Sequence, residues 1–152
     1  MDTSTSQTET PARLRVTRRF KASPQRVWRA WTEPELMMRW FVDTDADIRV
    51  CEVDLRTGGR YRLEGMAGGN PWRLRGEYLE VTPPTKLVYT WKWDDDPSLG
   101  GPGDTIVTVE FREVGKETEL TVTQDGFESE LARKEHMKGW EGCLDRLGSI
   151  VV

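Results

Sequence analysis

The only histidine of the sequence, His136, is the side chain best suited to acid-base chemistry. It lies four residues before Trp140, so the two side chains share one face if this region is helical. With an ordinary pKa near 6.5, an imidazole can serve as a general acid or base, or as a hydrogen-bonding group at the wetter end of a cavity. No second catalytic group is placed beside it. We therefore favour a structural role for His136, keep it as the one candidate for catalysis and assign no catalytic residue.

Tryptophan is abundant, with seven in 152 residues, and could build a binding site. Leu87, Tyr89, Trp91 and Trp93 occupy alternate positions, which puts them on one face of a strand. If that face points inward, it forms an aromatic wall whose indole and phenol groups can donate hydrogen bonds to a ligand. The opposing interpretation is that these large side chains fill the interior and leave no cavity. Both interpretations stay open at this stage.

Other familiar chemistries have little support. Cys51 and Cys143 occur in a chain without a recognisable signal peptide, so we expect two reduced thiols and a cytoplasmic location. Three consecutive aspartates from Asp94 lack the spacing of a calcium loop and are expected in an exposed loop over 94–103. No zinc, phosphate-loop or serine-nucleophile motif is present, and no apolar run is long enough to span a membrane. We expect no metal and no cofactor.

The net charge argues against binding to nucleic acid. The formal charge is -4 at pH 7, from 22 basic and 26 acidic residues, and no block of Lys and Arg accompanies it. A nucleic-acid-binding protein usually shows a basic patch or stripe. We therefore expect no nucleic-acid partner.

The element that must position His136 is a long C-terminal helix, predicted over 129–152. At one hundred degrees per residue, one stripe of this helix is largely apolar and the opposite face is charged. The stripe comprises Arg133, His136, Met137, Trp140, Leu144, Leu147 and Val151. The face expected to be solvated comprises Glu130, Lys134, Glu135, Lys138, Glu141, Asp145 and Arg146. We expect the helix to lie across a sheet, with a wetter end at His136 and a dry end from Trp140 onward.

Two short helices are predicted after a first strand over 14–20. Ser23 followed by Pro24 is typical of a helix start, with a serine N-cap and proline in the first turn. Thr32, with Glu35 three residues later, fits a capping box that would begin the second helix. We expect the two helices to form a V joined at Thr32.

The middle of the chain reads as about six strands in a meander. A change of alternation predicts a bulge near Val50 and Cys51, and Gly58-Gly59 predicts a turn. We expect a loose connection over 65–70, a phase change between Gly76 and Leu79, and a strand end at Pro83-Pro84. Strands over 87–93, 105–111 and 120–122 complete the series. Short turns between consecutive strands favour an antiparallel sheet, one face of which the long helix covers.

Several sequence blocks, in this order along the chain, resemble a known family. They are VWRAWTEPE over 27–35, Trp40, DLRTGGRY over 54–61, Gly76-Glu77, Pro83-Pro84 with LVYTW over 87–91, Gly139-Trp140, and LDRL over 144–147. Together they are similar to the signature blocks of the Activator of Hsp90 ATPase homologue 1-like proteins, which belong to the START/Bet v 1-like superfamily. The resemblance extends from about Leu14 to Val152.

The resemblance implies an α+β helix-grip fold. In such a fold a curved antiparallel sheet wraps around a long C-terminal helix, two short helices follow the first strand, and a cavity separates helix and sheet. We expect one such domain over 13–152, after a disordered tail over 1–12. Relatives in the superfamily bind lipids, sterols, polyketides or antibiotics, some are cyclases or ring hydroxylases, and one group stimulates a chaperone ATPase. The sequence shows no iron-binding pattern, and we expect it to lack the extra N-terminal domain of the eukaryotic chaperone activators.

The favoured hypothesis is that a small hydrophobic or aromatic molecule binds between the sheet and the C-terminal helix. The expected lining is Trp40, Tyr61, Leu63, Trp72, Tyr89, Trp91, Trp93, Val107, Val109, His136, Trp140 and Leu144. Two alternatives are kept: a cyclase-like or hydrolase-like enzyme that uses His136, and a chaperone-associated protein that acts through its surface. We expect a monomer or a weak homodimer, with a chaperone as a less favoured partner.

Overall fold

A computed structural model describes residues 13–42, 47–94 and 105–151 of the chain. The expected tail over 1–12 and almost all of the expected loop over 94–103 lie outside these residues. The described elements are β1 (Arg13–Phe20), α2 (Pro24–Thr32), α3 (Pro34–Trp40), β2 (Asp47–Val53), β3 (Arg60–Ala67), β4 (Asn70–Thr82), β5 (Lys86–Asp94), β6 (Thr105–Val114), β7 (Glu117–Asp125) and α4 (Glu130–Val151).

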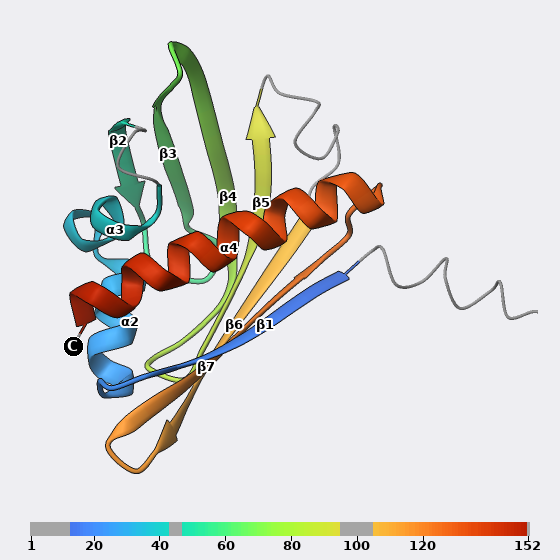
Figure 1. The fold of residues 1–152 in the computed structure, drawn as a ribbon. Helices are drawn as coiled ribbons and strands as arrows, with labels where there is room; N and C mark the ends of the chain where they lie inside the picture. Colours follow the sequence, from blue (N-terminus) through green and yellow to red (C-terminus); the bar gives the residue numbers. More distant parts are fainter. Residues whose placement is uncertain (1–12, 43–46, 95–104, 152) are drawn as a thin grey trace, which may run out of the picture.

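The strands form one antiparallel sheet in the order β1-β7-β6-β5-β4-β3-β2. From β2 to β7 each strand pairs with the next one in sequence, so the predicted meander is confirmed. β1 pairs with β7 and forms one edge of the sheet, opposite β2. Figure 1 shows α4 lying across the sheet, with α2 and α3 beside its C-terminal half. The α+β helix-grip architecture is confirmed.

The long helix is close to its predicted extent. Ser129 caps its start, because the Ser129 hydroxyl accepts a hydrogen bond of 3.1 Å from the backbone N–H of Ala132. His136, Trp140, Leu144, Leu147 and Val151 are buried as predicted. The stripe is shifted at its edges, since Ala132 and Cys143 are also buried while Arg133 and Met137 are only partly buried. None of the described helices is long and apolar enough to cross a membrane.

The predicted cap of the first short helix is confirmed and that of the second is wrong. The Ser23 hydroxyl accepts from the Arg26 N–H at 3.3 Å, with Pro24 in the first turn. Thr32, in contrast, belongs to the last turn of α2, and its hydroxyl donates to the Trp28 carbonyl at 2.9 Å. A threonine in a helix can hydrogen-bond the carbonyl four residues back, and this bond competes with capping. The N-cap of α3 is Glu33, which makes no side-chain cap bond.

Two strand predictions need correction. The connection over 65–70 is a tight turn at Gly68 and Gly69, whose φ angles of 58° and 81° suit a two-residue hairpin loop. In β4 the even-numbered positions face inward as far as the buried Tyr78, and the register shifts only between Tyr78 and Glu80, so Leu79 is 42% exposed and does not face inward as predicted. The predicted bulge in β2 is confirmed, with a register shift between Ile48 and Val50.

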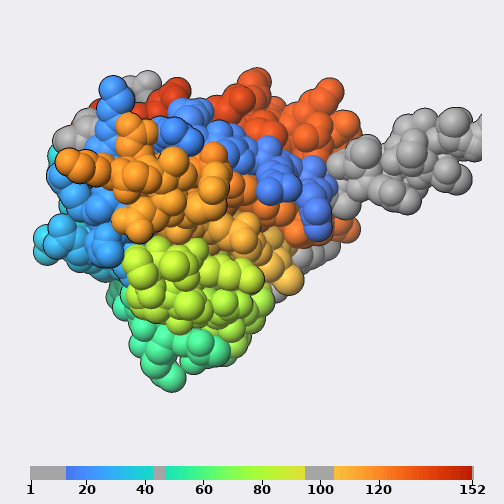
Figure 2. Space-filling view, turned by 90° about the horizontal axis from the view of Figure 1, so that it is seen from below, coloured from blue at the N-terminus to red at the C-terminus, as the bar shows by residue number. Residues whose placement is uncertain are grey.

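Between α4 and the sheet, the interior around Trp31, Trp40 and Trp140 is filled by side chains. Trp31 stacks on Trp140 with ring centroids 5.8 Å apart, and Trp40 lies 4.6 Å from Trp31. The Trp140 indole N–H donates to Oε1 of Gln124 at 2.8 Å, and Nε2 of Gln124 donates to Oγ1 of Thr105, also at 2.8 Å. Figure 2, seen from below, shows α2 (blue) at the surface next to the β6–β7 hairpin (orange) and the β4–β5 turn (yellow-green). This part of the interior therefore follows the filled-core interpretation.

Candidate functional site

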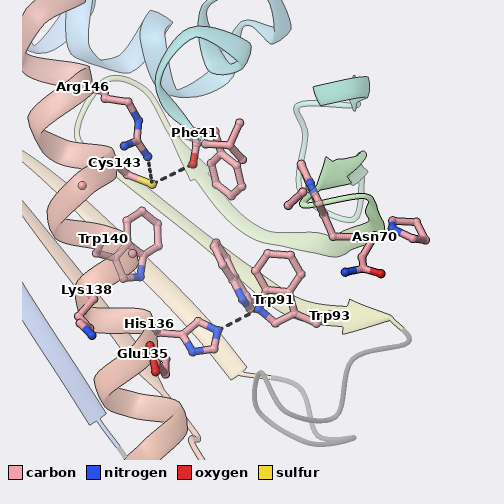
Figure 3. Close-up of a pocket in the computed structure, with 16 residues that line it drawn as sticks. Phe41, Asn70, Trp91, Trp93, Glu135, His136, Lys138, Trp140, Cys143 and Arg146 are labelled. Atoms are coloured by element: carbon pink, nitrogen blue, oxygen red, sulfur yellow. Dashed lines mark hydrogen bonds between the residues drawn. The ribbon is translucent and has the colours of Figure 1, made fainter. Parts of the chain in front are cut away.

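An open cleft of about 580 Å³ lies along one side of α4, from Glu135 to Arg146. It runs between α4, the end of β5, the β3–β4 turn and the residues after α3. Figure 3 shows its side chains projecting from these elements toward the open space. The lining comprises Phe41, Val42, Ala67, Asn70, Pro71, Trp72, Trp91, Trp93, Glu135, His136, Lys138, Gly139, Trp140, Gly142, Cys143 and Arg146.

Aromatic rings form the sheet side of the cleft. Trp91 and Trp93 face the same way because side chains two residues apart share one face of a strand. Their ring centroids are 5.7 Å apart in an edge-to-face arrangement, and Trp72 of β4 lies 6.2 Å from Trp93 in the same geometry. Phe41 lies 5.8 Å from Trp91 and extends the wall toward α3. Rings packed edge to face in this way hold one another in a fixed orientation.

The helix side of the cleft contains two glycines, Gly139 and Gly142. A Cβ atom built on Gly139 would meet nothing within 4 Å, whereas one on Gly142 would lie 3.3 Å from Nη1 of Arg146. Each glycine in a helix interior costs about 0.8–1 kcal/mol relative to alanine. The missing side chains leave room for the cleft along α4.

His136 uses both ring nitrogens within the protein. Nδ1 lies 2.8 Å from the Ala132 carbonyl oxygen, and Nε2 lies 2.9 Å from the Trp93 indole nitrogen. Because an indole N–H only donates, Nε2 must be unprotonated and Nδ1 must carry the proton. Burial lowers the pKa of His136, although the Ala132 hydrogen bond and Glu135 oppose that shift. His136 therefore stands as a neutral side chain that holds Trp93 in place.

At the far end of the cleft, hydrogen bonds join α3 to α4. The Cys143 thiol donates to the Phe41 carbonyl at 2.9 Å, and the Arg146 Nε–H donates to the Trp40 carbonyl at 3.1 Å. These carbonyls lie at the C-terminus of α3, where a helix leaves carbonyls without intrahelical partners. Burial raises the pKa of Cys143 to about 11. Both cysteines are free thiols, as predicted.

Two hydrogen-bond donors in the cleft wall lack an acceptor. Nε1 of Trp72 and Nε1 of Trp91 are buried and have no partner among the described residues. Leaving a buried donor unsatisfied costs about 1–3 kcal/mol. By contrast, the indole N–H groups of Trp31, Trp40, Trp93 and Trp140 all have acceptors.

The structure divides the predicted lining residues among three locations. Those that line the cleft are Trp72, Trp91, Trp93, His136 and Trp140. Tyr61, Leu63 and Tyr89 instead line a separate void of about 20 Å³, which also touches Trp91. Trp40, Val107, Val109 and Leu144 are fully buried in the core. Strand alternation identifies which side chains face inward, but it does not tell a filled region from an open one.

Several lining residues were missed from the sequence. Glu135, Lys138 and Arg146 were assigned to the solvated face of the helix; Glu135 and Lys138 are exposed as predicted, Arg146 is partly buried, and all three border the cleft. The cleft follows one side of α4, so it takes residues from both faces of the helical wheel. Gly139 gave a usable signal, since glycine in the interior of a helix often marks a packing or functional requirement. Within the described residues, no group of three or more His, Cys, Asp and Glu side chains is placed to hold a metal ion.

Comparisons with known proteins agree with this architecture. Residues 21–151 match the sequence model of a family described as Activator of Hsp90 ATPase homolog 1-like protein. Protein CV1439 of Chromobacterium violaceum has 30% sequence identity and a TM-score of 0.85, over 93% of this chain and 98% of that one. No curated protein matches the sequence.

Two further solved structures are similar. Protein NE0264 of Nitrosomonas europaea has 27% identity and a TM-score of 0.77, over 94% of this chain and 96% of that one. CalU16 of Micromonospora echinospora has 28% identity and a TM-score of 0.67, over 91% of this chain and 75% of that one.

Proposed function

The chain belongs to the Activator of Hsp90 ATPase homolog 1-like family, and on that premise we propose that the cleft beside α4 binds a small hydrophobic or aromatic molecule. The observation that carries the proposal is the contrast between two parts of the helix-sheet interface. The part around Trp31 and Trp40 is filled by side chains, and the part walled by Phe41, Trp72, Trp91 and Trp93 is an open space of about 580 Å³. Small-molecule sites typically enclose about 300–1,000 Å³ and are mostly apolar with a few polar groups.

Burial of apolar surface would supply the binding free energy. At about 25 cal/mol per Å², a ligand that removes roughly 200 Å² of apolar surface from water gains about 5 kcal/mol before the costs of association. The aromatic wall is already fixed by ring contacts and by the bond from Trp93 to His136. A preformed wall reduces the entropy lost on binding. The cleft therefore suits a flat, rigid ligand.

The role of His136 in this proposal is to position the wall. An acid or base must exchange a proton with a substrate, and both nitrogens of His136 are already engaged with Trp93 and Ala132. Using either nitrogen would break one of these bonds. We accordingly propose binding without turnover.

A titration with N-phenyl-1-naphthylamine, a neutral dye that fluoresces in apolar surroundings, tests the proposal. Trp72→Ala removes part of the half-buried wall, and Leu79→Ala removes an exposed apolar side chain outside the cleft. We expect the dye to bind the wild type, Trp72→Ala to weaken binding at least fivefold, and Leu79→Ala to change it less than twofold. Absence of binding, or equal effects of the two variants, would contradict the proposal.

The family description raises the possibility of a chaperone partner, and the same variants address it. A surface contact with a chaperone would not require an open cleft. If Trp72→Ala left stimulation of a chaperone ATPase unchanged while surface charge variants abolished it, the interaction alternative would replace the binding proposal.

A further inference from the structure

We propose that the ligand of the cleft carries an anionic group, such as a carboxylate, and that Arg146 binds this group. The inference rests on the proposed function and makes its ligand more specific: an aromatic or hydrophobic acid, with its apolar body against the tryptophan wall and its acidic end at Arg146. The argument starts from the surroundings of the Arg146 guanidinium.

Arg146 is held by neutral groups only. Its Nε–H donates to the Trp40 carbonyl at 3.1 Å, and one of its terminal nitrogens lies 3.7 Å from the Cys143 sulfur. No carboxylate among the described residues lies within ion-pair distance of it. The neighbouring acid on α4, Asp145, is taken by Arg18 of β1 at 2.6 Å. Arg146 is therefore a partly buried cation without a counter-charge in the described part of the chain.

The guanidinium is presented to the cleft. Nη1 lies beside Gly142, and both residues line the cavity. Figure 3 shows Arg146 and Cys143 at one end of the site and His136 with Glu135 at the other. A guanidinium has five N–H donors in a planar fork, so the two bonds to Trp40 and Cys143 leave donors free for a carboxylate. Two anchors hold the fork in place before a ligand arrives.

The remaining polar groups of the cleft are mainly donors. The unsatisfied indole N–H groups of Trp72 and Trp91 call for acceptors, although neither nitrogen is open to solvent in the present arrangement. Lys138 adds a second positive charge at the exposed rim, and among the described lining residues the one acidic side chain, Glu135, is at the His136 end. A ligand rich in acceptors, with its negative charge away from Glu135, complements this distribution.

The test compares two dyes that share one aromatic skeleton. N-phenyl-1-naphthylamine is neutral, and 8-anilinonaphthalene-1-sulfonate is the same skeleton with a sulfonate. The readout is the ratio of the two affinities, sulfonate over neutral dye. We expect Arg146→Gln to lower this ratio at least fivefold through loss of sulfonate-dye binding, with the affinity for the neutral dye changed less than twofold. The matched control is Lys134→Gln, which removes an exposed positive charge of the same helix outside the lining and should change the ratio less than twofold.

A decrease smaller than fivefold in Arg146→Gln would overturn the assignment of Arg146, even if both dyes bind. Failure of both dyes to bind the wild type would overturn the proposed function as well. Because Arg146 also anchors α3, the near-ultraviolet circular dichroism of the variant must match that of the wild type.

If that spectrum differs, the test is made in Lys138→Gln, where Arg146 is the remaining cation among the lining residues that the structure describes. Raising the salt concentration from about 0.05 M to 0.5 M should weaken binding of the sulfonate dye and not that of the neutral dye, because salt screens charge interactions. Equal salt responses would overturn the proposal.

Discussion

The indole N–H of Trp93 donates a hydrogen bond of 2.9 Å to Nε2 of His136 and thereby ties the end of β5 to α4 at the mouth of the cleft. The bond fixes the tautomer of the histidine, because only an unprotonated Nε2 can accept it. Nδ1 in turn interacts with the Ala132 carbonyl one turn earlier in the helix. Trp93 is thus positioned by a side chain whose charge state decides whether the bond exists.

Acidification should reduce stability through this pair. Burial lowers the pKa of His136 below its ordinary value of 6.5, so the unfolded chain takes up the proton first. The contribution of neutral His136 to the free energy of unfolding is fully present above pH 6.5. It is lost as the pH falls below that value toward the pKa of His136 in the folded state. Urea unfolding at pH 7.5, 6.5 and 5.5 should therefore show a decreasing free energy of unfolding.

The matched variant is His136→Gln, which keeps an acceptor for Trp93 and does not titrate. Its free energy of unfolding should fall less steeply over the same pH range. Parallel slopes for variant and wild type would assign the pH dependence to other groups.

Two tryptophan-to-phenylalanine variants should differ in cost although they remove the same atoms. Trp140→Phe leaves Oε1 of Gln124 buried without its donor, whereas Trp91→Phe removes an N–H that has no partner. An unsatisfied buried acceptor costs about 1–3 kcal/mol. We expect Trp140→Phe to lower the free energy of unfolding by that much more than Trp91→Phe, as measured with urea. Equal losses, or a larger loss for Trp91→Phe, would show that the Gln124 bond contributes little.

The fold could be predicted from local sequence patterns, but only part of the site could. Alternation over 87–93 identified the inward face of β5, and the glycine turns gave the meander, because both signals act over a few residues. Whether the space beyond that face is open depends on Trp31, which packs on Trp140 from a distant helix. The position of Arg146 was missed for a similar reason, since its partners are carbonyls of α3. Such contacts are set by how the elements pack, and no spacing within one segment encodes them.

A larger side chain at position 139 should close the cleft without disrupting the core. The space around a Cβ atom at this position is empty, and replacing a helix glycine removes a cost of about 0.8–1 kcal/mol. We expect Gly139→Leu to keep or raise the melting temperature and to weaken N-phenyl-1-naphthylamine binding at least tenfold. Glu141→Leu, at an exposed site on the same helix outside the lining, is the control. Undiminished binding in Gly139→Leu would place the dye elsewhere.

The two thiols should react slowly in the folded protein. Burial raises the pKa values of Cys51 and Cys143 to about 11 each, and the thiolate is the reactive form. At pH 8 roughly 0.1% of each thiol would then be ionised, against several per cent or more for an ordinary cysteine. Iodoacetamide labelling followed by mass spectrometry should show labelling at least tenfold slower without urea than with it. Labelling of Cys143 at the unfolded rate would contradict the buried environment described for it.

The central claim, that the open cleft beside α4 is a binding site, is tested most directly by the indole N–H signals in a ¹H–¹⁵N NMR spectrum. The seven tryptophans are reporters already in place: Trp72, Trp91, Trp93 and Trp140 line the cleft, while Trp31 and Trp40 lie in the filled core and Trp28 lies beside a separate surface hollow. During titration with N-phenyl-1-naphthylamine, we expect the signals of Trp72, Trp91 and Trp93 to shift most and that of Trp28 to stay in place. Shifts concentrated at Trp28, or no shifts at any indole, would contradict the claim.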